Sequence, residues 1–149
     1  MAANTAARFS LNGNNASDGG TTMAPIFTTA AADYTGATAT HNKKVFQADA
    51  TNGSRLAGIH FEAIGTNTAS VARIFSNNGS ANTTASNNSF LGQISLPATT
   101  ATNVASTPSV DFIFTGGYID LEAGFAIYAG IATTVAAGWF ATPILGGDF

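Results

Sequence analysis

The sequence predicts an all-β protein, an antiparallel β-sandwich that is jelly-roll-like and carries an extended N-terminal arm. Only 9% of the 149 residues are charged, whereas soluble domains average about 25%, and exposed helix faces normally carry Lys and Glu. Short β-prone segments alternate with turns rich in Gly and Asn. No segment combines helix caps with a charged outer face. We therefore expect an arm at residues 1–40 and a sandwich domain at residues 41–149.

The first forty residues differ in composition from the remainder of the chain. Apolar residues are sparse there, and neither helical nor strand periodicity persists, so this segment buries little surface by itself. One short strand is expected at Pro25–Thr29. Two interpretations stay open: an arm that lies along a partner through spaced apolar anchors, or a disordered tail. Residues 1–10 lack the basic start and apolar core of a signal peptide.

From residue 41 onward, the pattern predicts about eight short strands separated by turns or by two Thr-, Ala- and Asn-rich loops at 77–89 and 97–108. In one of them Ile59, Phe61 and Ala63 fall on one face, and His60 and Glu62 on the other. Such a series is typical of a sandwich, with a jelly roll as the expected topology. The expected strands are Lys44–Ala48, Ser54–Ile64, Ser70–Ser76, Phe90–Leu96, Val110–Thr115, Tyr118–Leu121, Phe125–Ile131 and Trp139–Leu145.

Charge and hydropathy exclude two classes of partner. The chain has five Lys and Arg residues and a net charge of -3, whereas nucleic-acid binding depends on phosphate neutralisation by basic side chains. The segment Gly124–Gly147 is uncharged and long enough to cross a bilayer. Gly138 and Pro143 interrupt it, and its pieces have the length of buried sandwich strands. We therefore expect neither a nucleic-acid partner nor a membrane span.

The chain is poor in residues that carry chemistry. His60 and Glu62 share a strand face, but nothing at metal-site spacing supplies the third ligand that Zn²⁺ requires. Asp120 and Glu122 lie near a turn, where a solvated rim is the first interpretation and a Ca²⁺ site or a carboxylate pair are the alternatives. There is no Cys and no Gly-x-Ser-x-Gly motif. We therefore expect a protein that is not an enzyme, with no catalytic residue, metal or cofactor.

Aromatic residues are the prominent feature, with eleven Phe, three Tyr and one Trp. Most of them must fill a core. Trp139 and Phe140 point to opposite faces of one strand, so one of the two faces away from the core and either contacts another subunit or is covered by a loop or the arm. The candidate interface residues are Phe9, Leu11, Ile26, Phe27, Trp139 and Phe140.

Two stretches carry a family resemblance. The first contains Gly53-Ser54-Arg55 and continues through Ala63–Phe75, and the second runs from Leu121-Glu122-Ala123-Gly124 to the ending Gly146-Gly147-Asp148-Phe149. They resemble the capsid cement or decoration proteins of tailed phages, which read "GSR…I…A.GT.TA..VRLF", then "LPAGW.L", and end "GGDY" or "GGDF". The resemblance covers about half of the chain and omits the first forty residues. Glu122 replaces the Pro of the family turn, and the 77–89 loop replaces a short hairpin.

The resemblance implies a β-sandwich that binds the outer surface of the virion capsid, after synthesis in the host cytoplasm. Its partners would be the major capsid protein and further copies of itself, with a homotrimer favoured and a dimer as the alternative. Arg55 and Arg73 match the motif, and a structural role implies pairing with Asp111 or Glu62 across the sheet. The alternative function is a virion fibre or tail module that binds glycans through Trp139, Tyr118 or Tyr128.

Overall fold

The computed structural model describes residues 26–31, 33–38, 40–144 and 147–148, which form eleven strands and one short 3-10 helix, Ala85–Asn87. All pairings between the strands are antiparallel, so the predicted all-β antiparallel class is confirmed. The strands are β1 (Ile26–Phe27), β2 (Lys43–Gln47), β3 (Ser54–Leu56), β4 (Gly58–Ala63), β5 (Ser70–Asn77), β6 (Asn88–Leu96), β7 (Ser109–Ile113), β8 (Ile119–Leu121), β9 (Ala126–Ile131), β10 (Trp139–Ile144) and β11 (Gly147–Asp148).

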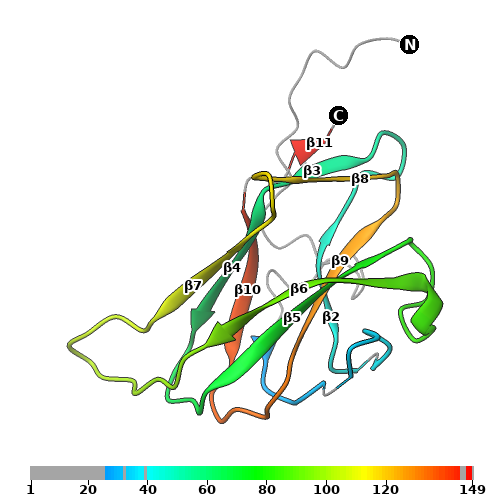
Figure 1. The fold of residues 1–149 in the computed structure, drawn as a ribbon. Coiled ribbons are helices and arrows are strands. Elements are labelled where there is room, and N and C mark those ends of the chain that lie inside the picture. Colours follow the sequence, from blue (N-terminus) through cyan, green and yellow to red (C-terminus); the bar gives the residue numbers. More distant parts are fainter. Residues whose placement is uncertain (1–25, 32, 39, 145–146, 149) are drawn as a thin grey trace.

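Two four-stranded sheets face each other, with orders β1-β10-β4-β7 and β2-β9-β5-β6 (Figure 1). A smaller sheet, β11-β3-β8, lies at one end of the sandwich (Figure 1). If β3 and β4 count as one bent strand, and β8 and β11 are set aside, successive strands alternate between the two large sheets except at β5 and β6, which are neighbours in one sheet. Such strand orders are typical of a jelly roll.

The segment predicted as one strand at Ser54–Ile64 divides at Ala57 into two strands that belong to different sheets. Ala57 lies outside both strands; its N–H donates to the carbonyl of Ile144, and its carbonyl accepts from Phe114. Gly58 follows at a crowded point, where an added Cβ would lie 2.3 Å from the carbonyl oxygen of Phe112. The segment that pairs with these two strands changes sheet at the same level, since β7 pairs with β4 and β8 pairs with β3.

The core lies between the two large sheets. In β4 the predicted alternation is confirmed: Ile59, Phe61 and Ala63 are buried, and His60 and Glu62 are partly exposed. Each large apolar side chain that is fully buried contributes about 1.5–3 kcal/mol. The largest fully buried apolar side chains are Trp139, Phe27, Phe61, Phe75, Leu56, Ile59, Ile74, Leu96, Ile127, Ile131 and Val45.

The described residues of the predicted arm pack against the sandwich. The strand expected at Pro25–Thr29 is β1, which pairs with β10. Two backbone hydrogen bonds continue this contact, from Ala31 N–H to the Ile131 carbonyl (2.7 Å) and from Val135 N–H to the Thr28 carbonyl (2.8 Å). Phe9 and Leu11 lie outside the described residues.

The two pieces expected within Gly124–Gly147 are the strands β9 and β10. Among the residues that the structure describes, no helix has the length and apolar character needed to cross a membrane.

Candidate functional site: the outer face of the β1-β10-β4-β7 sheet

The outer face of the β1-β10-β4-β7 sheet presents residues in rows that follow the strand register, with exposed or partly exposed side chains at every position except the buried Gly58. The first row crosses four strands and consists of Ile26, Phe140, Glu62 and Ser109. The second row crosses three strands and consists of Thr142, His60 and Asp111, and the third of Ile144, Gly58 and Ile113. Residues that lie directly opposite each other on paired strands share one face of the sheet. We call these three rows the outer face.

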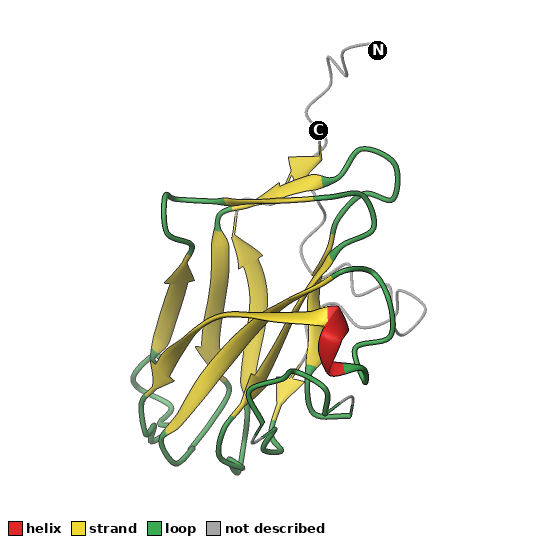
Figure 2. Ribbon diagram, turned by 45° about the vertical axis from the view of Figure 1, so that its right-hand side comes forward, coloured by secondary structure: helices red, strands yellow, loops and turns green. Residues whose placement is uncertain are grey.

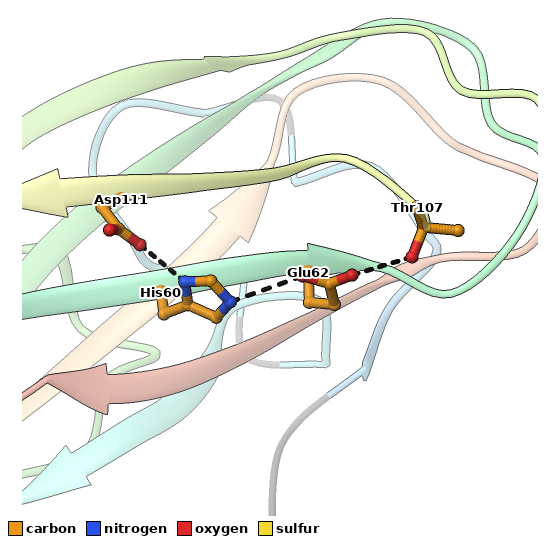
Figure 3. A network of polar contacts seen from close by, with 4 residues as sticks. All are labelled: His60, Glu62, Thr107 and Asp111. Atoms are coloured by element: carbon orange, nitrogen blue, oxygen red, sulfur yellow. Dashed lines mark hydrogen bonds and ion pairs between the residues drawn. The ribbon is translucent and has the colours of Figure 1, made fainter. Parts of the chain in front are cut away.

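A polar network occupies the centre of the outer face (Figure 3). His60 Nδ1 lies 2.6 Å from Oδ1 of Asp111 on β7, and His60 Nε2 lies 3.4 Å from Oε2 of Glu62 on the same strand. Thr107 donates its hydroxyl to Oε1 of Glu62 at 2.8 Å. The imidazole is therefore held between two carboxylates that approach its two nitrogens from different directions.

The geometry of this network differs from that of a catalytic His–Asp pair, in which the second ring nitrogen faces a nucleophile. Here that nitrogen faces the carboxylate of Glu62, and the nearby hydroxyl of Thr107 is bonded to Glu62. Because the carboxylates lie at different ring nitrogens, they do not converge on one point. Among the described residues, no group of three or more His, Cys, Asp or Glu side chains is placed to hold a metal ion. The network links β4 to β7 and presents oxygen acceptors on the surface.

The candidate interface residues that the structure describes divide between the core and the outer face. Ile26 is 37% exposed and lies directly opposite the partly exposed Phe140. Phe27 and Trp139 point inward and are only 1% and 0% exposed. This corrects the prediction for Phe27 and Trp139, because successive strand residues point to opposite faces and these two pack in the core of their own chain. Ile26 and Phe140 thus form an apolar pair at one side of the outer face.

Arg55 has a different partner from the one predicted. It donates to both carboxylate oxygens of Asp120, at 2.6 and 2.9 Å, and its guanidinium lies 3.8 Å from the ring centroid of Tyr118. The hydrogen bond from Arg55 lowers the pKa of Asp120 below its ordinary value. The expected partners, Asp111 and Glu62, belong to another sheet because the chain bends at Ala57. Asp120 therefore serves an ion pair with Arg55.

Arg73 also departs from the predicted pairing. Its side chain is 9% exposed, and its guanidinium donates to the backbone carbonyls of Ala31 (3.2 Å) and Asp33 (3.3 Å) and lies 3.9 Å from the ring centroid of Tyr34. Residues 31 and 33–38 thus cover part of the outer side of β5. For this reason Phe75, which shares that side with Arg73, is buried as well.

Two exposed aromatic rings lie on the outer side of the β5-β6 pair, and the sequence did not predict their contact. Tyr34 is 58% exposed and Phe90 is 42% exposed, and the rings meet edge to face at 5.7 Å. Phe90 also contacts Phe75 at 5.6 Å. Neither residue belongs to a local motif. Their proximity comes from the packing of residues 33–38 over β5, which periodicity does not predict.

The three aromatic rings predicted as candidates for glycan binding differ in how accessible they are. Trp139 is buried in the core, so its face is closed to a sugar. Tyr118 is exposed, but one face of its ring carries the Arg55 guanidinium. Tyr128 is partly buried, which raises the pKa of its hydroxyl.

Comparison of the chain with protein-family models, with curated proteins and with solved structures found no match.

Proposed function

We propose that the chain is a structural virion protein that binds the outside of an assembled phage capsid and stabilises it. The observation that carries the proposal is the open outer face with its apolar pair, Ile26 and Phe140. Exposed apolar side chains with a polar surround are typical of protein contacts. The sequence resemblance to cement proteins supports the capsid as the partner.

The charges of the outer face indicate what the partner surface offers. Glu62 and Asp111 place two carboxylates beside the apolar pair, and none of the residues in the three rows is Lys or Arg. A complementary surface therefore supplies hydrogen-bond donors or basic side chains around an apolar patch. We propose that the major capsid protein presents this surface once it is assembled.

A protein that binds only the assembled lattice stabilises it by mass action. The contribution per site is RT ln(1 + [L]/Kd), which reaches about 4 kcal/mol at a thousandfold excess of free ligand over Kd. The proposal requires no catalytic step.

Co-sedimentation with capsids of the virus that carries the gene tests the proposal, with unassembled capsid subunits as the reference. We expect saturable binding to capsids alone. Phe140→Ala removes the larger member of the apolar pair, so we expect it to weaken binding by about tenfold or more, which corresponds to at least about 1.4 kcal/mol. The measurement is a binding isotherm at limiting protein concentration.

Tyr118→Ala is the matched control, because it also removes an exposed aromatic ring, but next to β8 rather than on the outer face. It should leave the isotherm unchanged. Equal losses for the two variants would show that the outer face has no special role. No binding of the unaltered chain would reject the capsid proposal.

The second candidate function, a fibre or tail module that binds glycans, is favoured by one observation. Tyr34 and Phe90 are exposed rings in fixed mutual geometry, and sugars stack on such rings. A glycan array distinguishes the two functions. Binding to a glycan that is lost in Tyr34→Ala, together with no binding to capsids, would favour this candidate over the first.

A further inference from the structure

Most strands that end a sheet in this molecule carry a feature that discourages pairing with another chain. An edge strand exposes unpaired backbone N–H and C=O groups, and proteins protect such edges with charges, with Pro or by keeping them short. β2 carries Lys43 and Lys44, β7 carries Asp111 and β8 carries Asp120. β1 and β11 have two residues each in the part of the chain that the structure describes.

β6 is the exception among the described edge strands. It has nine residues, Asn-Ser-Phe-Leu-Gly-Gln-Ile-Ser-Leu, with no charge and no Pro. β5 pairs with it on one side, and no described strand pairs with it on the other (Figure 2). Leu96 is its single buried residue. A register shift between β5 and β6, opposite Ile74 and Phe75, interrupts the pairing but leaves Gly92–Leu96 in regular register.

The exposed aromatic pair lies at this same edge. Phe90 belongs to β6, and Tyr34 packs on its ring. Phe90, Gln93 and Ser95 lie on the outer side of the sheet, opposite Phe75, Arg73 and Val71 of β5. Phe90, Gln93 and Ser95 are exposed and uncharged. An identical edge brought alongside in antiparallel orientation would therefore meet no like charge on β6 and would bring uncharged side chains beside Phe90.

We infer that β6 is a self-association edge at which two copies of the chain pair antiparallel and form a two-fold dimer. The same operation at β2 or β7 would place Lys43 and Lys44, or Asp111, near their own copies, and like charges across paired strands are destabilising. The edge therefore favours a dimer, where the resemblance to cement proteins favours a trimer. The inference does not require capsid binding, because it concerns the purified chain alone.

Sedimentation equilibrium of the full chain over a dilution series tests the inference. We expect twice the mass of one chain at high concentration and the mass of one chain on dilution. Ser95→Lys places a cation on the β6 edge and should raise the dissociation constant by about tenfold or more. Thr51→Lys adds the same charge at an exposed loop position away from β6 and should leave the constant unchanged.

Ser95→Thr is the control at the same position, because it keeps the site neutral and strand-compatible. It should dimerise like the unaltered chain. Near-ultraviolet circular dichroism confirms that each variant is folded. A single-chain mass at every concentration, a trimer mass, or an unchanged dissociation constant in folded Ser95→Lys would each overturn the inference.

Discussion

Asp33 fixes the segment that carries Tyr34. Its Oδ1 accepts hydrogen bonds from the backbone N–H and the hydroxyl of Thr35, both at 2.9 Å, and its Oδ2 accepts from the Thr38 hydroxyl. Its backbone carbonyl accepts from Arg73. The Asp33 carboxylate and backbone carbonyl thus hold this turn in place over β5, and the turn positions the exposed ring of Tyr34.

The ionisation of Asp33 should make stability depend on pH. Burial raises the pKa of Asp33, but the hydrogen bonds from Thr38 and Thr35 outweigh it and lower the pKa from 3.8 to about 2. Because the folded pKa is depressed, this stabilisation is complete above the ordinary pKa and is lost as pH falls from 3.8 toward 2. Asp33→Asn should therefore lower the free energy of unfolding at neutral pH by roughly 1–2 kcal/mol, after allowance for solvent screening.

Urea unfolding of both proteins at several pH values measures this effect. The difference between Asp33→Asn and the unaltered chain should shrink as pH falls through this range. Thr38→Val removes one of the bonds and should reproduce part of the loss, whereas Thr38→Ser keeps the hydroxyl and should not. A difference that stays constant with pH would assign the loss to packing rather than to the carboxylate.

At the scale of strands, local sequence predicts the elements well where β-branched and aromatic runs end at turn residues. The expected Phe125–Ile131 strand differs from β9 by one residue at its start, and the expected Trp139–Leu145 strand begins with β10 at Trp139, while Leu145 lies outside the described residues. Alternation also predicts that His60 and Glu62 share a face. The division at Ala57 was not predictable, because both halves favour strand and the bend depends on β7 and β10. Asp111 was likewise not predicted as the partner of His60, since 51 positions separate them.

Gly130 in β9 lies in close contact with the segment that precedes β2. An added Cβ at Gly130 would lie 2.0 Å from Oδ1 of Asn42 and 3.0 Å from Cβ of Ala31. Asn42 is buried and holds its amide against the strand. Gly130→Ala should therefore lower the free energy of unfolding by about 1–3 kcal/mol, the usual range for overpacking. Thermal and urea unfolding measure the loss.

The combined variant Gly130→Ala/Asn42→Ala separates the clash from other effects. Removing the Asn42 amide relieves the closest contact, so the loss in the double variant should be smaller than the sum of the two single losses. Additive losses would mean that the amide is not what Gly130 accommodates.

At the scale of the whole molecule, the two proposed surfaces lie on different sheets, so both can be used at once. Antiparallel pairing of β6 with its copy continues one sheet across a two-fold axis perpendicular to that sheet. The β1-β10-β4-β7 sheets then lie in one layer, on the same side of the continued sheet. Both outer faces, each with Ile26 and Phe140, would therefore point in one direction, as binding to a repeating lattice requires.

This arrangement predicts that dimerisation strengthens capsid binding without any new contact to the capsid. A second site held by the first gains affinity through effective concentration, commonly by about 10²–10⁴-fold when the geometry allows both to bind. Ser95→Lys should therefore weaken apparent capsid affinity at limiting concentration, although Ser95 lies outside the outer face. Thr51→Lys adds the same charge at an exposed loop position and should not. If Ser95→Lys abolishes the dimer and leaves capsid affinity unchanged, the two surfaces act independently and each subunit binds the lattice alone.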